Sequence, residues 1–142
     1  MRRLLAKLGG VAAAVMLTAG MSHPAQAAAP AYFEFQDFTG SKAVFELTDE
    51  TRIQEARDIL SGKEKDRVHV FGRIVHRPAA WNPGWSYHYD PSTVNFFEVA
   101  IEVCDASMTY VEDHLDEAGG AFLPGDFWCP WTSKLTREVP AP

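Results

Sequence analysis

The stretch over residues 96–115 constrains the fold most, because its hydrophobic period changes at a cysteine. Apolar side chains occupy every second position over residues 97–103, which is the period of a half-buried strand. Over residues 108–118 the apolar positions recur at helical spacing, with acidic residues between them. Cys104 lies at the junction, and Ser107 is a good helix N-cap. We therefore expect a strand that passes into a helix at Cys104.

The same reading of the rest of the chain predicts a small α+β domain. The element order is strand, helix, strand, inserted hairpin, strand, helix, strand, a ferredoxin-like β-α-β-β-α-β order with an extra hairpin. We expect the two helices to cover one face of an antiparallel sheet. This single domain is predicted over residues 42–139, and residues 28–41 form an N-terminal tail with a possible edge strand.

The first residues have the pattern of an export signal. Arg2, Arg3 and Lys7 precede an apolar run, and residues 25–27 read Ala-Gln-Ala, an A-x-A cleavage pattern. The apolar run is short for a membrane span and is broken by glycines. We expect residues 1–27 to be a signal peptide and the remaining chain to be secreted or periplasmic.

The charge of the chain excludes some partners. Residues 1–27 carry three basic and no acidic residues, so their removal changes the net charge from −6 to −9. Nucleic-acid binding needs clustered lysine and arginine, and so does binding to anionic membrane surfaces. We therefore expect neither nucleic acid nor membrane as a partner, and the ligand to be a protein, a peptide or a small molecule.

The chain has two cysteines, Cys104 and Cys129. In an exported protein, two cysteines most often form one disulfide. The alternative is that Cys104 is a nucleophile served by a histidine such as His114. We favour the disulfide, because an oxidising compartment leaves few thiols free.

The tryptophans lie in or beside two irregular loops rich in proline and glycine. Aromatic side chains on such loops can form a binding platform, although they more commonly pack as a small hydrophobic cluster. His88 and Asp90 project from the same side of a predicted strand near one of these loops. The residues predicted to line a ligand site are Trp85, His88, Asp90, Trp128 and Trp131.

Two further functions stay open on these residues. A small secreted hydrolase could use His88 as a general base with Asp90 or Glu98, although this spacing is weakly specific and a hydrogen-bonded structural histidine is the more common case. A protease inhibitor would need an exposed rigid loop such as residues 82–84. No motif for a metal or a cofactor is present, and we expect no cofactor and no catalytic residues.

Several segments together resemble a known family. They run Glu-Ala-Arg-Asp-Ile-Leu-Ser-Gly over residues 55–62, Asn-Pro-Gly-Trp-Ser-Tyr-His over 82–88, the stretch from Phe96 to Leu115, and Phe-Leu-Pro-Gly over 122–125 with Trp-Cys-Pro-Trp over 128–131. They are similar to a family of small, often exported domains labelled "calmodulin-binding protein" after a slime-mould member. Calmodulin targets are basic amphipathic helices, and neither predicted helix here is basic. The resemblance therefore implies an exported binding module, without implying calmodulin as its partner.

Overall fold

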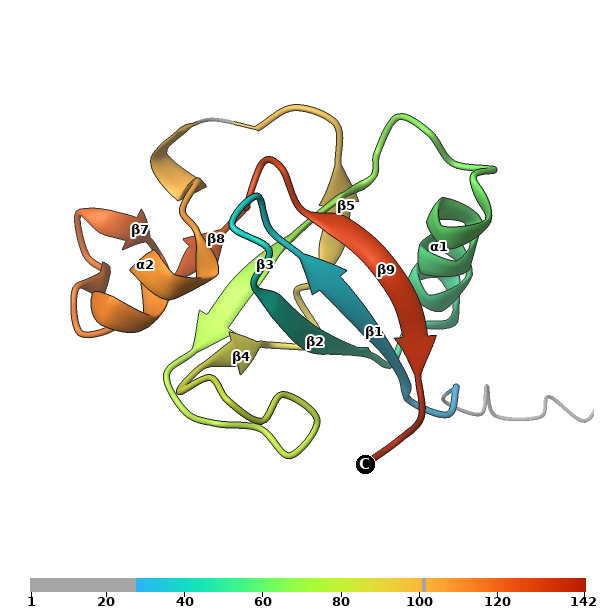
Figure 1. Cartoon of the computed structure of the whole chain (residues 1–142), viewed down its shortest axis with the longest axis horizontal. Coiled ribbons are helices and arrows are strands. Elements are labelled where there is room, and N and C mark those ends of the chain that lie inside the picture. The colour runs from blue at the N-terminus through green and yellow to red at the C-terminus, as the bar shows by residue number, and fades with distance from the viewer. Residues whose placement is uncertain (1–27, 101) are drawn as a thin grey trace, which may run out of the picture.

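The computed structural model describes residues 28–100 and 102–142, and the predicted signal peptide lies outside these residues. Figure 1 shows strands packed at the centre of the molecule, with a helix at each end. The α-helices are α1 (Glu50–Ser61) and α2 (Met108–Asp113), and a 3-10 helix, η1, spans Glu102–Cys104. The strands are β1 (Ala31–Gln36), β2 (Lys42–Leu47), β3 (His69–Val75), β4 (His88–Tyr89), β5 (Asn95–Phe97), β6 (Ala118–Gly119), β7 (Phe122–Pro124), β8 (Phe127–Trp128) and β9 (Lys134–Val139).

The first sheet is antiparallel and has the order β2-β1-β9. Phe33 of β1 lies opposite Phe45 of β2 on one side and Glu138 of β9 on the other. We expected β1 to be at most an edge strand of an N-terminal tail, but it is the central strand. The difference arises because the last strand returns to pair along it, a long-range pairing that no local pattern reveals.

A second group of strands forms around β3, which pairs antiparallel with β4, β5 and β8. Aromatic side chains fill the space between this group and the first sheet. The Phe35 and Trp128 ring centroids are 5.8 Å apart, and Tyr89 stacks on Trp128 at 5.1 Å. All three side chains are buried, so Trp128 belongs to the core between the sheets.

The two helices lie at opposite ends of the molecule in Figure 1. Helix α1 contacts β9 and β2, and capping residues fix both of its ends. The side chain of Asp49 caps its N-terminus by accepting from Arg52 N, and Gly62 ends it at φ 77°. The structure confirms a mixed chain of antiparallel sheets and two α-helices. The ferredoxin-like order is not confirmed, because the strands form separate small sheets and the helices do not share one face.

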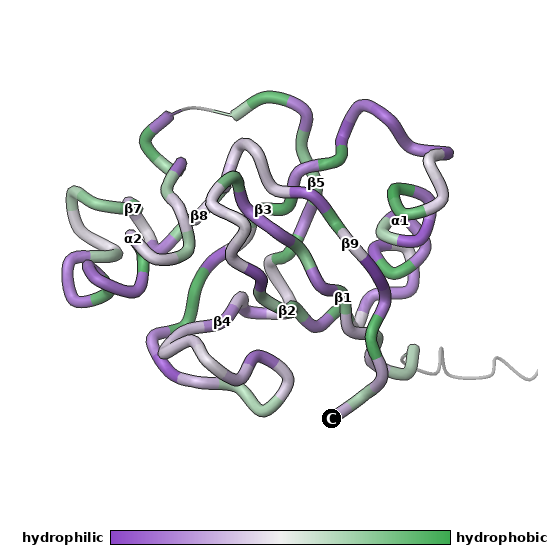
Figure 2. Tube along the Cα trace, viewed as in Figure 1, coloured by the Kyte–Doolittle hydropathy of each residue, from purple (hydrophilic) through white to green (hydrophobic). Residues whose placement is uncertain are grey.

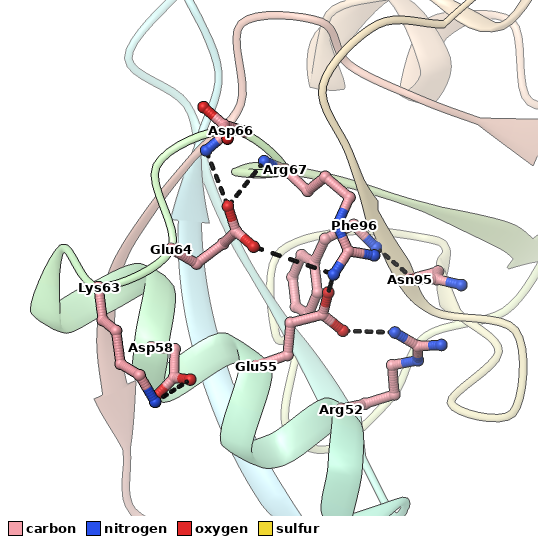
Figure 3. Close-up of polar contacts among 9 residues, drawn as sticks. All are labelled: Arg52, Glu55, Asp58, Lys63, Glu64, Asp66, Arg67, Asn95 and Phe96. Carbon is pink, nitrogen blue, oxygen red and sulfur yellow. Dashed lines mark hydrogen bonds and ion pairs between the residues drawn. The ribbon is translucent and has the colours of Figure 1, made fainter.

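The charged loop after α1 is tied to the helix by ion pairs (Figure 3). The guanidinium of Arg67 lies 2.6 Å from a carboxylate oxygen of Glu55, and Arg52 pairs with the other oxygen of Glu55. Lys63 pairs with Asp58 at 3.0 Å. The pairs of Arg67 and Lys63 connect α1 to the chain that leads into β3, so they tie this exposed loop to the helix.

The predicted strand over residues 96–103 is the main correction to the expected fold. Strand β5 ends at Phe97, which lies opposite His69, the first residue of β3. Beyond Phe97 the partner strand has ended, so the chain has no ladder to continue. Val99 and Val103 are therefore exposed although the alternating pattern predicts them as buried. Figure 2 shows that the chain leaving β5 includes hydrophobic residues although it lies outside the sheets.

Helix α2 is short and is fixed by polar contacts from distant parts of the chain. Ser107 caps it, as predicted, by accepting from Tyr110 N at 3.2 Å. The buried carboxylate of Asp37, from the turn between β1 and β2, accepts from Met108 N at 2.8 Å. Its other oxygen accepts from Thr39 N and Ser41 N. Asp37 thus joins the first turn of the domain to the start of α2, near the disulfide.

Candidate functional site

The two cysteines are bonded to each other, as predicted. The Cα atoms of Cys104 and Cys129 lie 5.1 Å apart, within the range that a disulfide requires. Cys129 N also donates to Cys104 O at 2.8 Å. The bond joins the end of η1 to the residue that follows β8. Since both sulfurs are in this bond, Cys104 is not a free nucleophile.

Hydrogen bonds reinforce the corner around the disulfide. The indole nitrogen of Trp128 donates to Ala106 O at 2.9 Å, and Trp131 N donates to a carboxylate oxygen of Asp105 at 3.0 Å. The loop over residues 128–131 is therefore held at several points against the chain that enters α2. This corner is rigid because covalent and polar contacts fix it from both sides.

An apolar pocket of about 380 Å³ opens beside this corner. Its walls come from β3, β5, the irregular chain after β5, the disulfide, and the segment that carries β7 and β8. The lining residues are Phe71, Phe97, Val99, Ala100, Val103, Cys104, Pro124, Phe127, Trp128 and Cys129. None of these side chains carries a charge. The pocket is therefore built to take an apolar group rather than to perform acid–base chemistry.

Exposed apolar side chains surround the mouth of the pocket. Val99 is 77% exposed, Val103 49% and Phe127 38%. They account for three of the five large hydrophobic residues that are exposed in the described part of the chain. A contiguous exposed apolar patch around a pocket is typical of an interaction site.

Charges of both signs lie near the pocket. The guanidinium carbon of Arg73 is 5.3 Å from the centroid of the Phe127 ring, a cation–π contact on the β8 side of the pocket. On the other side, Glu98 and Glu102 are exposed in the chain that carries Val99 and Val103. Their carboxylates make no hydrogen bond or ion pair with any other described residue.

Two of the five predicted site residues, His88 and Asp90, make contacts that stabilise the fold around them. His88 is buried, its Nδ1 lies 2.7 Å from Arg77 O, and its ring packs edge-on to Trp81 at 5.4 Å. Asp90 accepts hydrogen bonds from the backbone and the hydroxyl of Ser92, which fixes the turn after β4. Neither the carboxylate of Asp90 nor that of Glu98 contacts His88 within the described residues.

The three predicted tryptophans have separate surroundings. The indole of Trp85 donates to Lys42 O at 2.8 Å, and its ring is 5.8 Å from that of Tyr87. Tyr87 in turn contacts Trp128, the only one of the five that lines the apolar pocket. Trp131 lines another hollow with His69. No ring contact between His88 and any of these three tryptophans is found in the described residues, and a ligand site formed by all five stays a prediction.

Sequence reasoning missed most of the pocket. The alternating pattern predicts Val99 and Val103 on one face of a half-buried strand, and the prolines and glycine of residues 122–131 predict an irregular loop. The structure also brings together His76 and Asp126, with Nε2 2.8 Å from a carboxylate oxygen on an exposed surface. These two residues are fifty positions apart, so spacing could not have paired them. In the described residues no group of three or more histidine, cysteine or acidic side chains is arranged to hold a metal ion.

Comparison with known proteins identifies the family but no close relative. No curated protein and no solved structure matches the chain. Across residues 28–100 and 102–142, none of the helices has the length and apolar character that a membrane span requires. One family model, described as the BP-74 N-terminal domain, matches residues 29–142, which includes every element described above. This chain therefore belongs to the family of the BP-74 N-terminal domain.

Proposed function

We propose that this protein is an exported binding module that takes an apolar side chain of a protein partner into the pocket beside the disulfide. The observation that carries the proposal is the pocket of about 380 Å³ with uncharged walls and an exposed apolar rim. Burying one large apolar side chain contributes about 1.5–3 kcal/mol. A central pocket of this kind is where the binding energy of an interface concentrates.

The shape of the site supports a protein partner rather than an isolated small molecule. Val99 and Val103 are on the outer surface, where a small molecule seated in the pocket would leave much of them in water. A protein surface can place one side chain in the pocket and cover these rim residues at the same time. The covered rim would then exclude water from the central contact.

The disulfide supports the proposal because it holds the walls in place before binding. Cys104 and Cys129 themselves line the pocket, and the bond joins its two sides. A preorganised site loses less conformational entropy when the partner binds. We therefore assign the disulfide the role of shaping the site as well as stabilising the fold.

The contacts of His88 favour a binding module over the hydrolase. A general base needs a ring nitrogen that can reach a substrate, and a partner that orients it. His88 is buried, and one of its ring nitrogens lies 2.7 Å from a backbone carbonyl oxygen. In the loop considered for an inhibitor, Asn82 is buried and bonds both Val44 N and Tyr87 O, which leaves only Pro83 and Gly84 exposed.

We do not extend the calmodulin label to this chain. Helix α1 mixes basic and acidic side chains in ion pairs, and α2 contains Glu112 and Asp113 and no basic residue. A basic amphipathic helix, the usual calmodulin target, is thus absent from the described residues.

Export is supported by the leader-like sequence over residues 1–27, and a disulfide is compatible with an oxidising compartment. We expect the secreted protein to begin near Ala28. N-terminal sequencing of the exported product would check this, and an intact Met1 on a cytoplasmic protein would contradict it.

The binding site can be tested with a neutral peptide that carries a tryptophan–leucine pair between serines. Titrated into the isotope-labelled protein, it is expected to shift amide resonances over residues 97–104 and 124–129, which line or adjoin the pocket. Shifts confined to other parts of the molecule, or no shifts at millimolar peptide, would contradict the proposal.

A further inference from the structure

We propose that the partner presents its apolar anchor beside lysine or arginine side chains, so that the site recognises a basic and apolar segment of a protein. This inference rests on the proposed binding function and specifies the chemistry of the partner. It is carried by the charges that border the pocket.

The first observation is that Glu98 and Glu102 lie in the chain that forms one wall of the pocket. Glu98 falls between the lining residues Phe97 and Val99, and Glu102 directly precedes the lining residue Val103. Both are exposed. A cationic group on a partner whose anchor is in the pocket would therefore pass close to both carboxylates.

The second observation is that these carboxylates have no partner among the described residues. Three other glutamates are held in ion pairs away from the pocket: Glu34 with Lys42 and Arg137, Glu55 with Arg52 and Arg67, and Glu138 with Arg57. Unpaired carboxylates beside an apolar surface attract a cation, because the adjoining apolar walls reduce solvent screening once the partner is seated.

The opposite side of the pocket determines where the cations enter. Arg73 is on the β8 side, over the Phe127 ring. A basic partner would be repelled there and attracted to the side that carries Glu98 and Glu102. The apolar anchor then lies between its own basic flank and Arg73, which fixes the direction of the bound segment.

The net charge of the domain also favours a basic partner. Residues 28–142 have a net charge of −9, so the domain as a whole attracts basic partners over long range. Such steering raises the association rate and is reduced by salt. The carboxylates of Glu98 and Glu102 add a short-range electrostatic contribution. Each exposed ion pair that forms is expected to raise the affinity roughly 1.5- to 5-fold.

The test compares three six-residue peptides with the same central tryptophan–leucine pair, flanked by lysine, serine or glutamate. We expect the lysine peptide to bind the full exported chain several-fold more tightly than the serine peptide, and the glutamate peptide to bind most weakly. In E98Q/E102Q the ratio of lysine-peptide to serine-peptide affinity should fall toward one. The control E50Q/D66N removes two exposed charges at the α1 end of the molecule and should largely preserve the ratio.

The outcomes separate this inference from the proposed function. Equal binding of the lysine and serine peptides at the pocket would overturn the basic partner and leave the apolar binding site standing. The same drop in the ratio for E98Q/E102Q and E50Q/D66N would show that only net charge matters, which also overturns the local role of Glu98 and Glu102. Failure of all three peptides to bind would overturn the binding function itself.

Discussion

Cys104 and Cys129 join two segments that share no strand pairing. Cys104 ends a 3-10 helix, and its carbonyl oxygen accepts a backbone hydrogen bond from Cys129 N. The loop after β8 has no regular structure of its own to fix it. The covalent bond therefore carries much of the order of this corner, where the pocket is formed.

Replacing either cysteine by serine should destabilise the domain to a similar extent. The bond closes a loop of 25 residues, and removing it is expected to cost about 3–4 kcal/mol of unfolding free energy in the chain-entropy model. The double variant Cys104→Ser/Cys129→Ser should cost little more than either single change, since one bond is lost in each case. Chemical denaturation with and without reductant measures this. A reductant that leaves the wild-type protein as stable as before would contradict the prediction.

Glu34 should make stability depend on pH in acid. It is buried in β1, where the Arg137 guanidinium and the Thr136 hydroxyl hold the pKa of its carboxyl at about 2, below its ordinary 4.5. The unfolded chain therefore binds a proton at a higher pH than the folded chain does. The stabilisation is fully present above pH 4.5 and is lost as the pH falls toward 2.

The variant Glu34→Gln tests this assignment. It should be less stable than the wild type at neutral pH, and the difference should shrink as the pH falls through this window. Denaturation curves at several acid pH values measure it. Asp66→Asn serves as a control, because Asp66 is exposed and makes no hydrogen bond or ion pair with Glu34. An equal difference at all pH values would show that Glu34 is not held ionised by its partners.

At the level of elements, the boundary of β5 determines whether the pocket exists. If the strand continued to Val103, its apolar residues would be in the core and the pocket would lose one wall. Strand β5 ends because β3 offers no partner before His69. The chain is then free to turn outward and present Val99 and Val103 at the surface.

Two valine substitutions distinguish a strand β5 that ends at Phe97 from one that continues to Val103. Val70→Ala removes part of a fully buried side chain of β3 and should cost roughly 1–3 kcal/mol of unfolding free energy. Val99→Ala should change stability by less than about 0.5 kcal/mol, because the residue is exposed. Equal losses for the two variants would place Val99 in the core and contradict the short β5.

Elements whose signals are local could be predicted from sequence, and those that depend on distant partners could not. The start of α1 at Asp49, its end at Gly62 and the Ser107 cap all follow from capping chemistry within a few residues. The disulfide followed from the cysteine count and the expected compartment. The alternating pattern after Phe97 indicated a strand, but a strand also needs a neighbour, and the start of β3 is set elsewhere in the chain.

The apolar pocket could not be predicted from the sequence either, because it also depends on contacts between distant residues. Its walls come from residues 71, 97, 99–100, 103–104, 124 and 127–129, which only the fold brings together. The predicted site residues fall in two short stretches, 85–90 and 128–131, and most of their contacts are with distant residues, as in the Trp85 bond to Lys42 O. Trp128 was predicted as a site residue, and it lines the pocket while also packing in the core.

At the scale of the whole molecule, a rigid aromatic core supports an apolar surface that is left open. Trp128 connects the two, since its ring stacks on Tyr89 inside the domain and also lines the pocket. The ion pairs of α1 lie at the other end of the molecule, so this ion-paired surface is separate from the apolar pocket. This division fits a domain that stays soluble while one face binds a partner.

Binding of the neutral tryptophan–leucine peptide to two variants tests the central claim most directly. Val99→Asp places a charge at the pocket mouth, and Phe38→Asp places one on a residue that is 69% exposed in the turn between β1 and β2 and does not line the pocket. Neither change should unfold the domain, because both side chains are exposed, and a thermal melt checks this. We predict that Val99→Asp abolishes the peptide-induced shifts over residues 97–104 and 124–129, whereas Phe38→Asp retains them. Loss of binding in Phe38→Asp with retention in Val99→Asp would place the binding site elsewhere and contradict the proposed function.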